Sequence, residues 1–206
     1  MIITKSKKTY LLLILFIIVI ITFFSIKFFK DLSDKSINEL NYAQQFLYKG
    51  MIEKALNEKN IRKDYLGLSN ISYKYPFTNA GNIANFYAGI CYYDLYNYEK
   101  CIDMMKKFHS KDEIMSSIKY GIIGDAYLQM NDKKKAINNY IIASTIKINE
   151  INTPLYYYKA ALLYLCDNKY KESKYYLKEI ENKYPSFIYI DDVEKYISFI
   201  ENKILT

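Results

Sequence analysis

Three stretches of the chain align with one another residue for residue, and this internal repeat restricts the fold more than any other feature. The stretches start about 35 residues apart, and five positions keep the same spacing in all three. A period of this length is typical of helical hairpins, which bury their apolar faces only by stacking on their neighbours. The aligned positions are Gly89, Tyr92, Cys101, Met105 and Phe108, then Gly124, Tyr127, Ala136, Tyr140 and Ala143, and finally Ala161, Tyr164, Ser173, Leu177 and Ile180. The chain is therefore predicted to be all-α, since five matches in three registers disfavour an ordinary helical bundle with accidental self-similarity.

Within each repeat, a small residue on the first helix precedes a small residue on the second helix by twelve positions. Small side chains at both places let two antiparallel helices approach closely. The predicted turn residues between the helices tolerate the left-handed conformation, and they are Asn97, Asn131 with Asp132, and Asn168. The third repeat is expected to begin with Thr153 as N-cap and Pro154 in the first turn, and to end before Pro185. Asp112–Glu113 and Asp191–Asp192 are interpreted as helix N-termini.

These residues resemble the tetratricopeptide repeat (TPR) family, which couples a small residue and Tyr on one helix with a small residue and an aromatic residue on the next. The segment from Gly124 to Tyr140 is a close match, whereas Cys101 stands where the family usually has Ala. The resemblance covers roughly residues 82–185. We assign 82–206 to the repeats with a capping helix, and 30–81 to a degenerate first hairpin. The hairpin is suggested by Leu68, Ile71 and Pro76, with Ile52 and Asp64 in its small-residue positions, and the cap by Val193, Tyr196, Ile197, Ile200 and Ile204.

A second strong signal is an apolar stretch at the N-terminus. Tyr10 to Ile26 carries no charge, and Phe28 and Phe29 extend the stretch. Its 17 residues span about 25 Å as a helix, close to the ~30 Å hydrocarbon core of a bilayer. A cleavable signal peptide is the main alternative, but the region Thr22–Lys27 lacks the small residues of a cleavage site. We interpret 10–29 as an uncleaved transmembrane signal anchor that follows a cytoplasmic segment, 1–9.

The lysines that flank this stretch predict its orientation. Three lysines without acidic neighbours (Lys5, Lys7 and Lys8) precede it, and two (Lys27 and Lys30) follow it, accompanied by Asp31 and Asp34. The positive-inside rule therefore favours a cytoplasmic N-terminus and an exported domain. The expected location is the bacterial inner membrane, crossed once, with the repeats in the periplasm.

The charge distribution argues against a nucleic-acid partner. The chain carries 29 basic and 22 acidic residues, for a net charge of +7, and five of the lysines lie in residues 1–30, which contain no acid. The repeats are thus nearly balanced, and no basic face is expected.

Catalysis, cofactors and metals are likewise not expected. No glycine-rich phosphate loop is present, the single His109 follows a helix end, and Cys91, Cys101 and Cys166 show no CxxC spacing. We therefore predict that the chain is not an enzyme.

Protein binding is expected on the face formed by the first helices of the repeats. The repeat register places Gly121 and eight further residues on this face, with an apolar and aromatic character. Because Lys and Asn are missing from these positions, a clamp for a C-terminal carboxylate is disfavoured. The eight candidate binding residues, called the first-helix groove below, are Phe86, Ile90, Tyr93, Asp125, Leu128, Tyr158, Leu162 and Leu165. For each of these residues, the alternative is that its side chain is buried in the core between adjacent repeats and binds no partner.

The layout of anchor and exported repeats resembles the YfgM type of ancillary subunit of the SecYEG translocon. Members of that family carry one N-terminal transmembrane helix and a periplasmic TPR domain. The resemblance implies translocon subunits and periplasmic chaperones as partners, and a role in translocation or chaperone handover. Two alternatives remain open, namely an envelope-assembly or cell-division scaffold, and an anchored receptor for peptides or other ligands.

Overall fold

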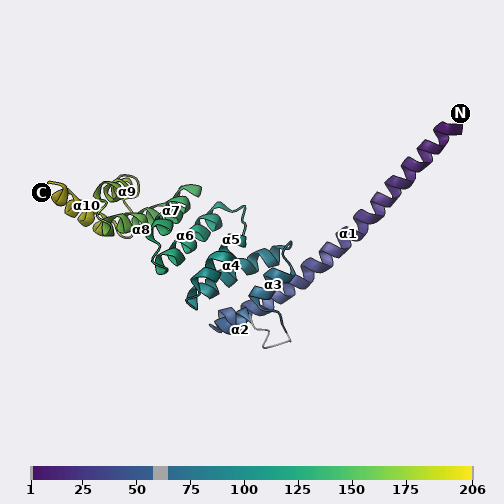
Figure 1. Cartoon of the computed structure of the whole chain (residues 1–206), viewed down its shortest axis with the longest axis horizontal. Coiled ribbons are helices and arrows are strands. Elements are labelled where there is room, and N and C mark those ends of the chain that lie inside the picture. The colour runs from purple at the N-terminus through teal and green to yellow at the C-terminus, as the bar shows by residue number, and fades with distance from the viewer. Residues whose placement is uncertain (1, 58–64, 206) are drawn as a thin grey trace. The chain divides into compact units, whose positions relative to one another are not determined.

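All regular secondary structure in the described part of the chain is helical, as the sequence predicts. The structure is a computed structural model, and it describes residues 2–57 and 65–205. The helices are α1 (Ile2–Tyr48), α2 (Ile52–Leu56), α3 (Leu68–Lys74), α4 (Asn79–Asp94), α5 (Tyr98–Lys107), α6 (Glu113–Gln129), α7 (Lys133–Ile146), α8 (Asn152–Cys166), α9 (Tyr170–Lys183) and α10 (Ile190–Leu205) (Figure 1). They form two compact units, Met1–Ala84 and Asn85–Thr206.

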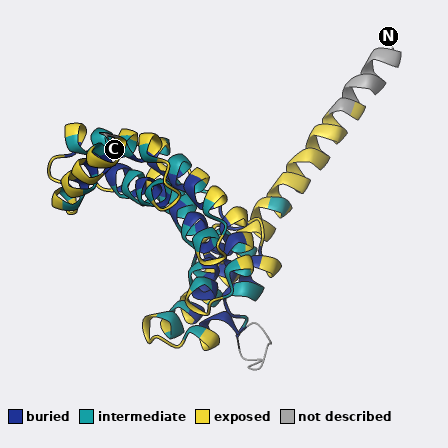
Figure 2. Cartoon of the chain, turned by 60° about the vertical axis from the view of Figure 1, so that its left-hand side comes forward, coloured by how far each residue is buried: buried dark blue, intermediate teal, exposed yellow. Residues whose placement is uncertain are grey.

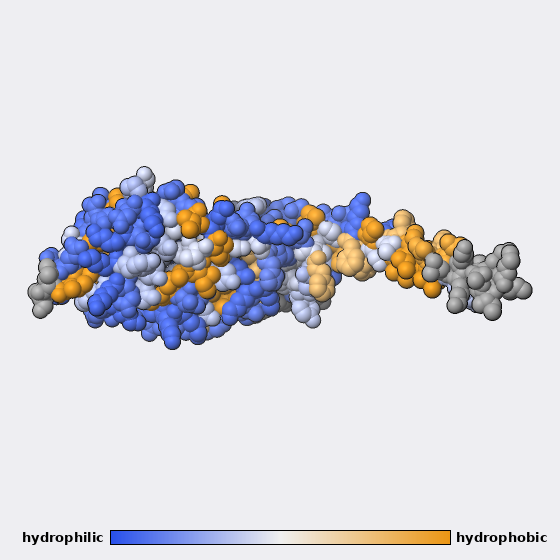
Figure 3. Space-filling model, turned by 90° about the horizontal axis from the view of Figure 1, so that it is seen from above, coloured by the Kyte–Doolittle hydropathy of each residue, from blue (hydrophilic) through white to orange (hydrophobic). Residues whose placement is uncertain are grey.

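The N-terminal unit is built on one continuous helix of 47 residues. From Leu12 to Phe29, all but one of its side chains are exposed, and the hydrophobic surface along this helix is visible in Figure 3. By length and composition, it is the one helix in the described residues that could cross a membrane. The helix continues past Phe29 without a break, so the apolar stretch and the following polar stretch form a single rod.

The C-terminal part of α1 carries the two short helices of this unit. Ser36, Leu40 and Ala43 lie on one face of α1 and are buried, because their spacing of four and three residues brings them into line. The Tyr65 hydroxyl donates to the Lys54 carbonyl (2.6 Å), and the Asn57 amide donates to the Tyr65 carbonyl (2.8 Å). Polar contacts thus supplement a small apolar core.

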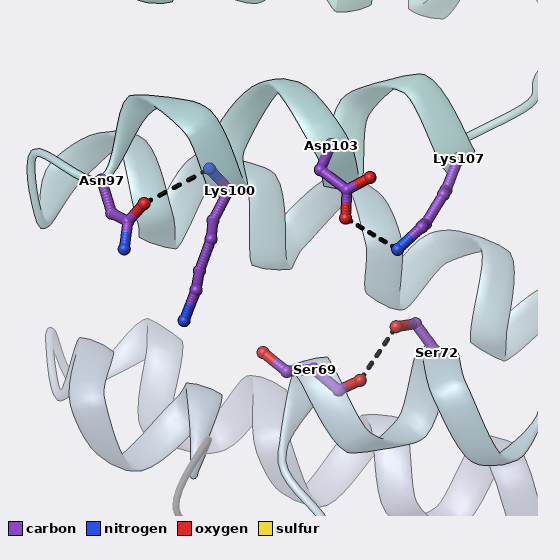
Figure 4. Close-up of polar contacts among 6 residues, drawn as sticks. All are labelled: Ser69, Ser72, Asn97, Lys100, Asp103 and Lys107. Atoms are coloured by element: carbon purple, nitrogen blue, oxygen red, sulfur yellow. Dashed lines mark hydrogen bonds and ion pairs between the residues drawn. The ribbon is translucent and has the colours of Figure 1, made fainter.

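In the segment predicted as a degenerate hairpin, the structure has the end of the long helix α1 followed by the two short helices α2 and α3. Leu68 and Ile71 are buried on α3, and Pro76 follows the end of that helix. Ile52 begins α2 and is half-buried, whereas Asp64 lies outside the described residues. Ser72 on α3 donates to the Ser69 carbonyl at 2.9 Å (Figure 4).

The C-terminal unit consists of helical hairpins with the predicted small-residue contacts. A Cβ atom on Gly89 would lie 2.8 Å from the Met105 side chain, and one on Gly124 would lie 2.6 Å from the Tyr140 ring. In the third repeat, the Ser173 hydroxyl donates to the Ala161 carbonyl at 2.9 Å. The small residues therefore allow the close approach of α4 and α5, of α6 and α7, and of α8 and α9.

Buried residues recur along each of these helices (Figure 2) and gather in clusters between them. Ala136, Tyr140 and Tyr156 belong to a cluster that joins α7 to α8. Leu177 and Ile180 belong to a second cluster, which α10 covers with Val193, Ile197 and Ile200. The predicted capping helix thus closes the apolar end of the stack.

The helix ends confirm most of the predicted turn chemistry and correct two assignments. Asn131 and Asn168 adopt the left-handed conformation, with φ of 61° and 57°. In the first repeat, however, Tyr96 takes that conformation (φ 60°), and Asn97 instead caps α5 by accepting from the Lys100 amide (3.3 Å, Figure 4). Thr153 is not an N-cap, because α8 begins at Asn152 and the Thr153 hydroxyl donates to the Ser144 carbonyl. Asp112 caps α6 through the Met115 amide.

Candidate interaction surface

Asp125 is the only charged member of the predicted first-helix groove, and it joins three helices. Its carboxylate accepts from the Tyr140 hydroxyl at 2.6 Å, and from the Lys159 ammonium at 2.7 and 2.9 Å. Both members of the Asp125–Lys159 ion pair keep about a third of their side chains exposed. The pair therefore neutralises the centre of the groove and links α6 to α7 and α8.

Two tyrosine rings support this ion pair. The Tyr140 and Tyr156 rings are stacked with centroids 6.2 Å apart, and the Lys159 ammonium lies 5.4 and 5.9 Å from them. Tyr156 also packs directly over Gly121, where a Cβ atom would overlap its ring and hydroxyl. Burial raises the pKa of the Tyr140 hydroxyl far above its usual range, and the neighbouring Asp125 carboxylate raises it further. Tyr140 therefore remains a neutral hydrogen-bond donor.

The N-terminal part of the groove is aromatic. Burial raises the pKa of the half-buried Tyr93 hydroxyl, and the negative charge of the Asp125 carboxylate raises this pKa further. Tyr93 also makes an edge contact with Tyr98, at a centroid distance of 5.5 Å. Ile90 is half-buried on the preceding turn of α4. Tyr93 is thus close enough to Asp125 for the carboxylate to influence its hydroxyl.

An apolar cleft of about 470 Å³ lies at the C-terminal end of this surface. Leu165 contributes from α8, and Tyr196 and Phe199 contribute from α10. Phe199 is 46% exposed, so an aromatic ring borders the cleft and remains accessible. We call this feature the α8–α10 cleft. Its size falls within the range of small-ligand and side-chain pockets.

The side chains of the remaining candidate residues are partly or wholly buried against other residues of the C-terminal unit. Phe86 is only 9% exposed and packs against Phe108, so its ring belongs to the core. Tyr158 stacks on Tyr189 (5.4 Å) and also contacts Phe187. Leu128 is half-buried against the cluster between α7 and α8, and Leu162 is half-buried on α8. Leu165 and Asp125 are also half-buried, but Leu165 lines the α8–α10 cleft and Asp125 holds the ion pair with Lys159.

Lys159 and Phe199 contribute to this surface but were missed by the sequence interpretation. Lys159 follows Asp125 by 34 residues, which is close to one repeat period. Opposite charges at this separation on successive first helices are a signal that could have identified the pair. Phe199 lies between the buried positions Ile197 and Ile200, and its role depends on how α10 packs, which the sequence does not specify.

The three cysteines are free thiols in different surroundings. Cys91 and Cys101 are fully buried, and burial raises the pKa of each thiol to about 12. Cys101 thus acts as the compact apolar group expected in its small-residue position. Cys166 is exposed and borders the α8–α10 cleft.

Comparison with solved structures supports the fold. The crystal structure of MamA, a TPR-like helical protein, matches with a TM-score of 0.56 and 20% sequence identity, covering 78% of this chain and 93% of that chain. No family model matches the sequence, and no curated protein matches it either. The chain therefore has a TPR-like helical fold. At this level of identity, the likeness applies to the fold alone.

Proposed function

We propose that the chain is a membrane-anchored scaffold that binds a partner protein on its first-helix face. The observation that carries this proposal is the α8–α10 cleft, where Leu165, Tyr196 and Phe199 leave about 470 Å³ open beside an exposed aromatic ring. Exposed aromatic residues beside a pocket are frequent binding hot spots. An apolar side chain of the partner fills the cleft, while the partly exposed pair Asp125–Lys159 offers polar contacts on the first helices α6 and α8.

The apolar part of α1 acts as the membrane anchor in this proposal. Exposing the apolar stretch of residues 12–29 to water is unfavourable at about 25 cal/mol per Å², whereas a bilayer accommodates it. Anchoring also raises the local concentration of the scaffold near membrane partners. We further propose a cytoplasmic N-terminus and exported repeats, on the basis of the flanking lysines.

The anchor and its orientation are tested together. Retention of the chain in membranes after alkaline carbonate extraction is expected, as is digestion of the repeats by protease added outside spheroplasts. Release by carbonate contradicts membrane insertion. Full protection while the membrane is intact reverses the orientation.

For the partner class, we propose translocon subunits or chaperones at the exported side of the membrane. The layout of one N-terminal anchor and TPR-like repeats supports this choice. Co-purification from native membranes after crosslinking is expected to recover translocon subunits as the main partners. Recovery of envelope-assembly or cell-division proteins instead replaces this assignment by the envelope scaffold.

The cleft itself is tested by substitution in the whole chain. Replacing Phe199 by Ser removes the exposed ring, and we expect recovery of the main crosslinked partner to fall about tenfold. Tyr175→Ser is the matched control, because Tyr175 is 61% exposed but lies on a second helix, α9. Both variants should retain the helical circular dichroism of the unchanged chain. Equal recovery with both variants means that the cleft does not bind the partner.

A further inference from the structure

A second cleft, of about 530 Å³, lies between α5, α6 and α7. Three lysines from three different helices line it, namely Lys106, Lys119 and Lys135, together with Tyr120, Tyr127 and Asn138. We call it the lysine cleft. No acidic side chain is among its lining residues, so its composition contrasts with the paired charges of the first-helix groove.

The lysine cleft and the first-helix groove occupy opposite faces of α6. Successive residues of an α-helix are rotated by about 100°, so residues three or four apart share a face. The lysine cleft takes Tyr120, Ile123 and Tyr127 from α6, whereas the groove takes Asp125 and Leu128. The mean directions of the two sets are about 140° apart by this rotation, and a ligand of one cleft does not cover the other.

The three lysines differ in how they are held. The Lys119 ammonium donates to the Phe108 carbonyl at 2.7 Å, and burial lowers its pKa. Lys135 pairs with Asp132 at 2.7 Å, with 60% of its side chain exposed. Lys106 is exposed and makes no ion pair with any residue that the structure describes. Two of the three charges thus lack a carboxylate partner within the described chain.

Polar donors and aromatic rings complete the lining. The Lys119 ammonium lies 5.5 Å from the centre of the Tyr120 ring, and the Lys135 ammonium lies 5.1 Å from that of Tyr127. Neither tyrosine hydroxyl is hydrogen-bonded within the described residues, and the same holds for the Asn138 side chain. The cleft therefore offers positive charge and neutral donors in one place.

We propose that the lysine cleft binds an acidic segment of a partner protein, with two or more carboxylates placed on lysines of different helices. Charge complementarity favours an anion, because the lining combines three cations with no acid. A single phosphate is disfavoured. Arginine forks and helix N-terminal amides are frequent phosphate ligands. No arginine lines the cleft, and the first-turn amide of Lys135 already donates to the Asp132 carboxylate at 3.0 Å. Lysines spread over three helices suit an extended peptide with several carboxylates.

The test measures binding of a fluorescent peptide to the whole chain in detergent, by anisotropy. The probe is a ten-residue peptide of alternating Glu and Gly with one Phe, and its counterpart has Gln in place of every Glu. We expect the Glu peptide to bind, to weaken at least fivefold when salt rises from about 50 to 500 mM, and to bind far better than the Gln peptide. Equal binding of the two peptides overturns the proposal.

Variants locate the binding. The double variant Lys106→Gln with Lys135→Gln is expected to weaken Glu-peptide binding about tenfold, since both lysines are exposed and their loss leaves the fold intact. Lys171→Gln, on the exposed face of α9, removes one charge elsewhere and should leave binding unchanged. Unchanged binding in the double variant overturns the proposal.

Two further measurements distinguish this proposal from its alternatives. Phe199→Ser should leave Glu-peptide binding unchanged, so failure of the α8–α10 cleft and failure of the lysine cleft are distinguishable. Inorganic phosphate and vesicles of anionic lipid should compete weakly with the Glu peptide. If either competes at least as well as an unlabelled Glu peptide, the acidic peptide is replaced by a phosphate ligand.

Discussion

In the Asn85–Thr206 unit, hairpins pack through small residues at a fixed spacing, whereas in the Met1–Ala84 unit a 47-residue helix carries helices of only five and seven residues. Direct contacts between helices hold the first arrangement. Gly124 lies against Tyr140, and the Ser173 hydroxyl reaches the Ala161 carbonyl. Long-range polar bonds help to hold the second, such as the Leu66 amide to the Glu39 carboxylate at 3.1 Å.

The difference shows where a sequence repeat determines structure. In the repeats, the same spacing recurs, and each hairpin depends on the same type of close contact between its two helices. A larger side chain at a small-residue position therefore disturbs the contact that holds its hairpin together. In the N-terminal unit, individual hydrogen bonds take the place of the recurring small-residue contacts. The loss of one such bond should destabilise only the helices that it joins.

Gly124→Leu should have the largest effect. A Cβ atom at this position would lie 2.6 and 2.7 Å from the Tyr140 ring and 3.3 Å from the Ala136 carbonyl. The helices must separate, and we expect a loss of about 3 kcal/mol of stability. Thermal melting of the whole chain in detergent, followed by circular dichroism, measures it. Lys134→Leu, an exposed position on α7, should cost less than about 0.5 kcal/mol. Equal effects would show that the repeat register is wrong.

Raising the pH should destabilise the repeat unit through its buried thiols. The folded-state pKa of Cys91 and of Cys101 is raised by burial to about 12, above the unfolded value of about 8.5. The folded state therefore retains protons that the unfolded state loses, and stability present below pH 8.5 falls as the pH rises toward 12.

Between pH 8.5 and 9.5, the expected loss is about 1 kcal/mol for each thiol. Melting under reducing conditions should show this loss for the unchanged chain and a shallower pH dependence for the variant Cys91→Ala with Cys101→Ala. Alanine suits position 101, because Ala136 fills the equivalent position of the second repeat. Identical pH profiles for the two proteins contradict the prediction.

Tyr140→Phe should cost about 1.5 kcal/mol, because it removes a hydrogen bond of 2.6 Å to the Asp125 carboxylate while Lys159 still pairs with that carboxylate. Tyr127→Phe is the matched control, since no side-chain hydrogen bond of Tyr127 is present in the described residues and its loss should cost under about 0.5 kcal/mol. The melting temperatures of both variants decide the comparison. A larger loss for Tyr127→Phe would contradict a structural role for the Tyr140 bond.

The same contrast explains which parts of the structure were predictable from the sequence alone. The hairpins, their small residues and the capping helix were predictable because the signal for each occurs at a recurring spacing. Phe86 was assigned to the groove by the same spacing, yet it is buried against Phe108, because the register gives the direction of a side chain and not what covers it.

Features that depend on two distant segments were not predictable in this way. The continuation of α1 beyond Phe29 required knowing that Ser36, Leu40 and Ala43 would find partners on one face. The α8–α10 cleft depends on the packing angle of α10, and the lysine cleft on the meeting of three helices. Neither arises from a local pattern of residues.

Tyr65→Phe should affect the N-terminal unit by about 1 kcal/mol. The substitution removes the hydrogen bond from the Tyr65 hydroxyl to the Lys54 carbonyl (2.6 Å), which ties the residue before Leu66 to α2. Hydrogen exchange of the amides in α2 and α3 should accelerate, while exchange in α6 to α9 stays unchanged. Tyr73→Phe, at a position that is 88% exposed, is the control. Faster exchange throughout both units would contradict the local character of this bond.

The smallest expected effect concerns the ion pair between Asp103 and Lys107 on the exposed side of α5 (Figure 4). Its oxygen and nitrogen atoms are 2.7 Å apart, but the side chains are 56% and 55% exposed, so water and salt screen the attraction. Lys107→Ala should cost about 0.3 kcal/mol at low salt and nothing measurable at about 0.5 M salt. Lys106→Ala, which removes an unpaired lysine from the same helix, provides the baseline for helix propensity. If Lys107→Ala is as costly as Tyr140→Phe, then exposed charges stabilise the repeats as much as buried hydrogen bonds, and the contrast between packed repeats and locally bonded N-terminal unit fails.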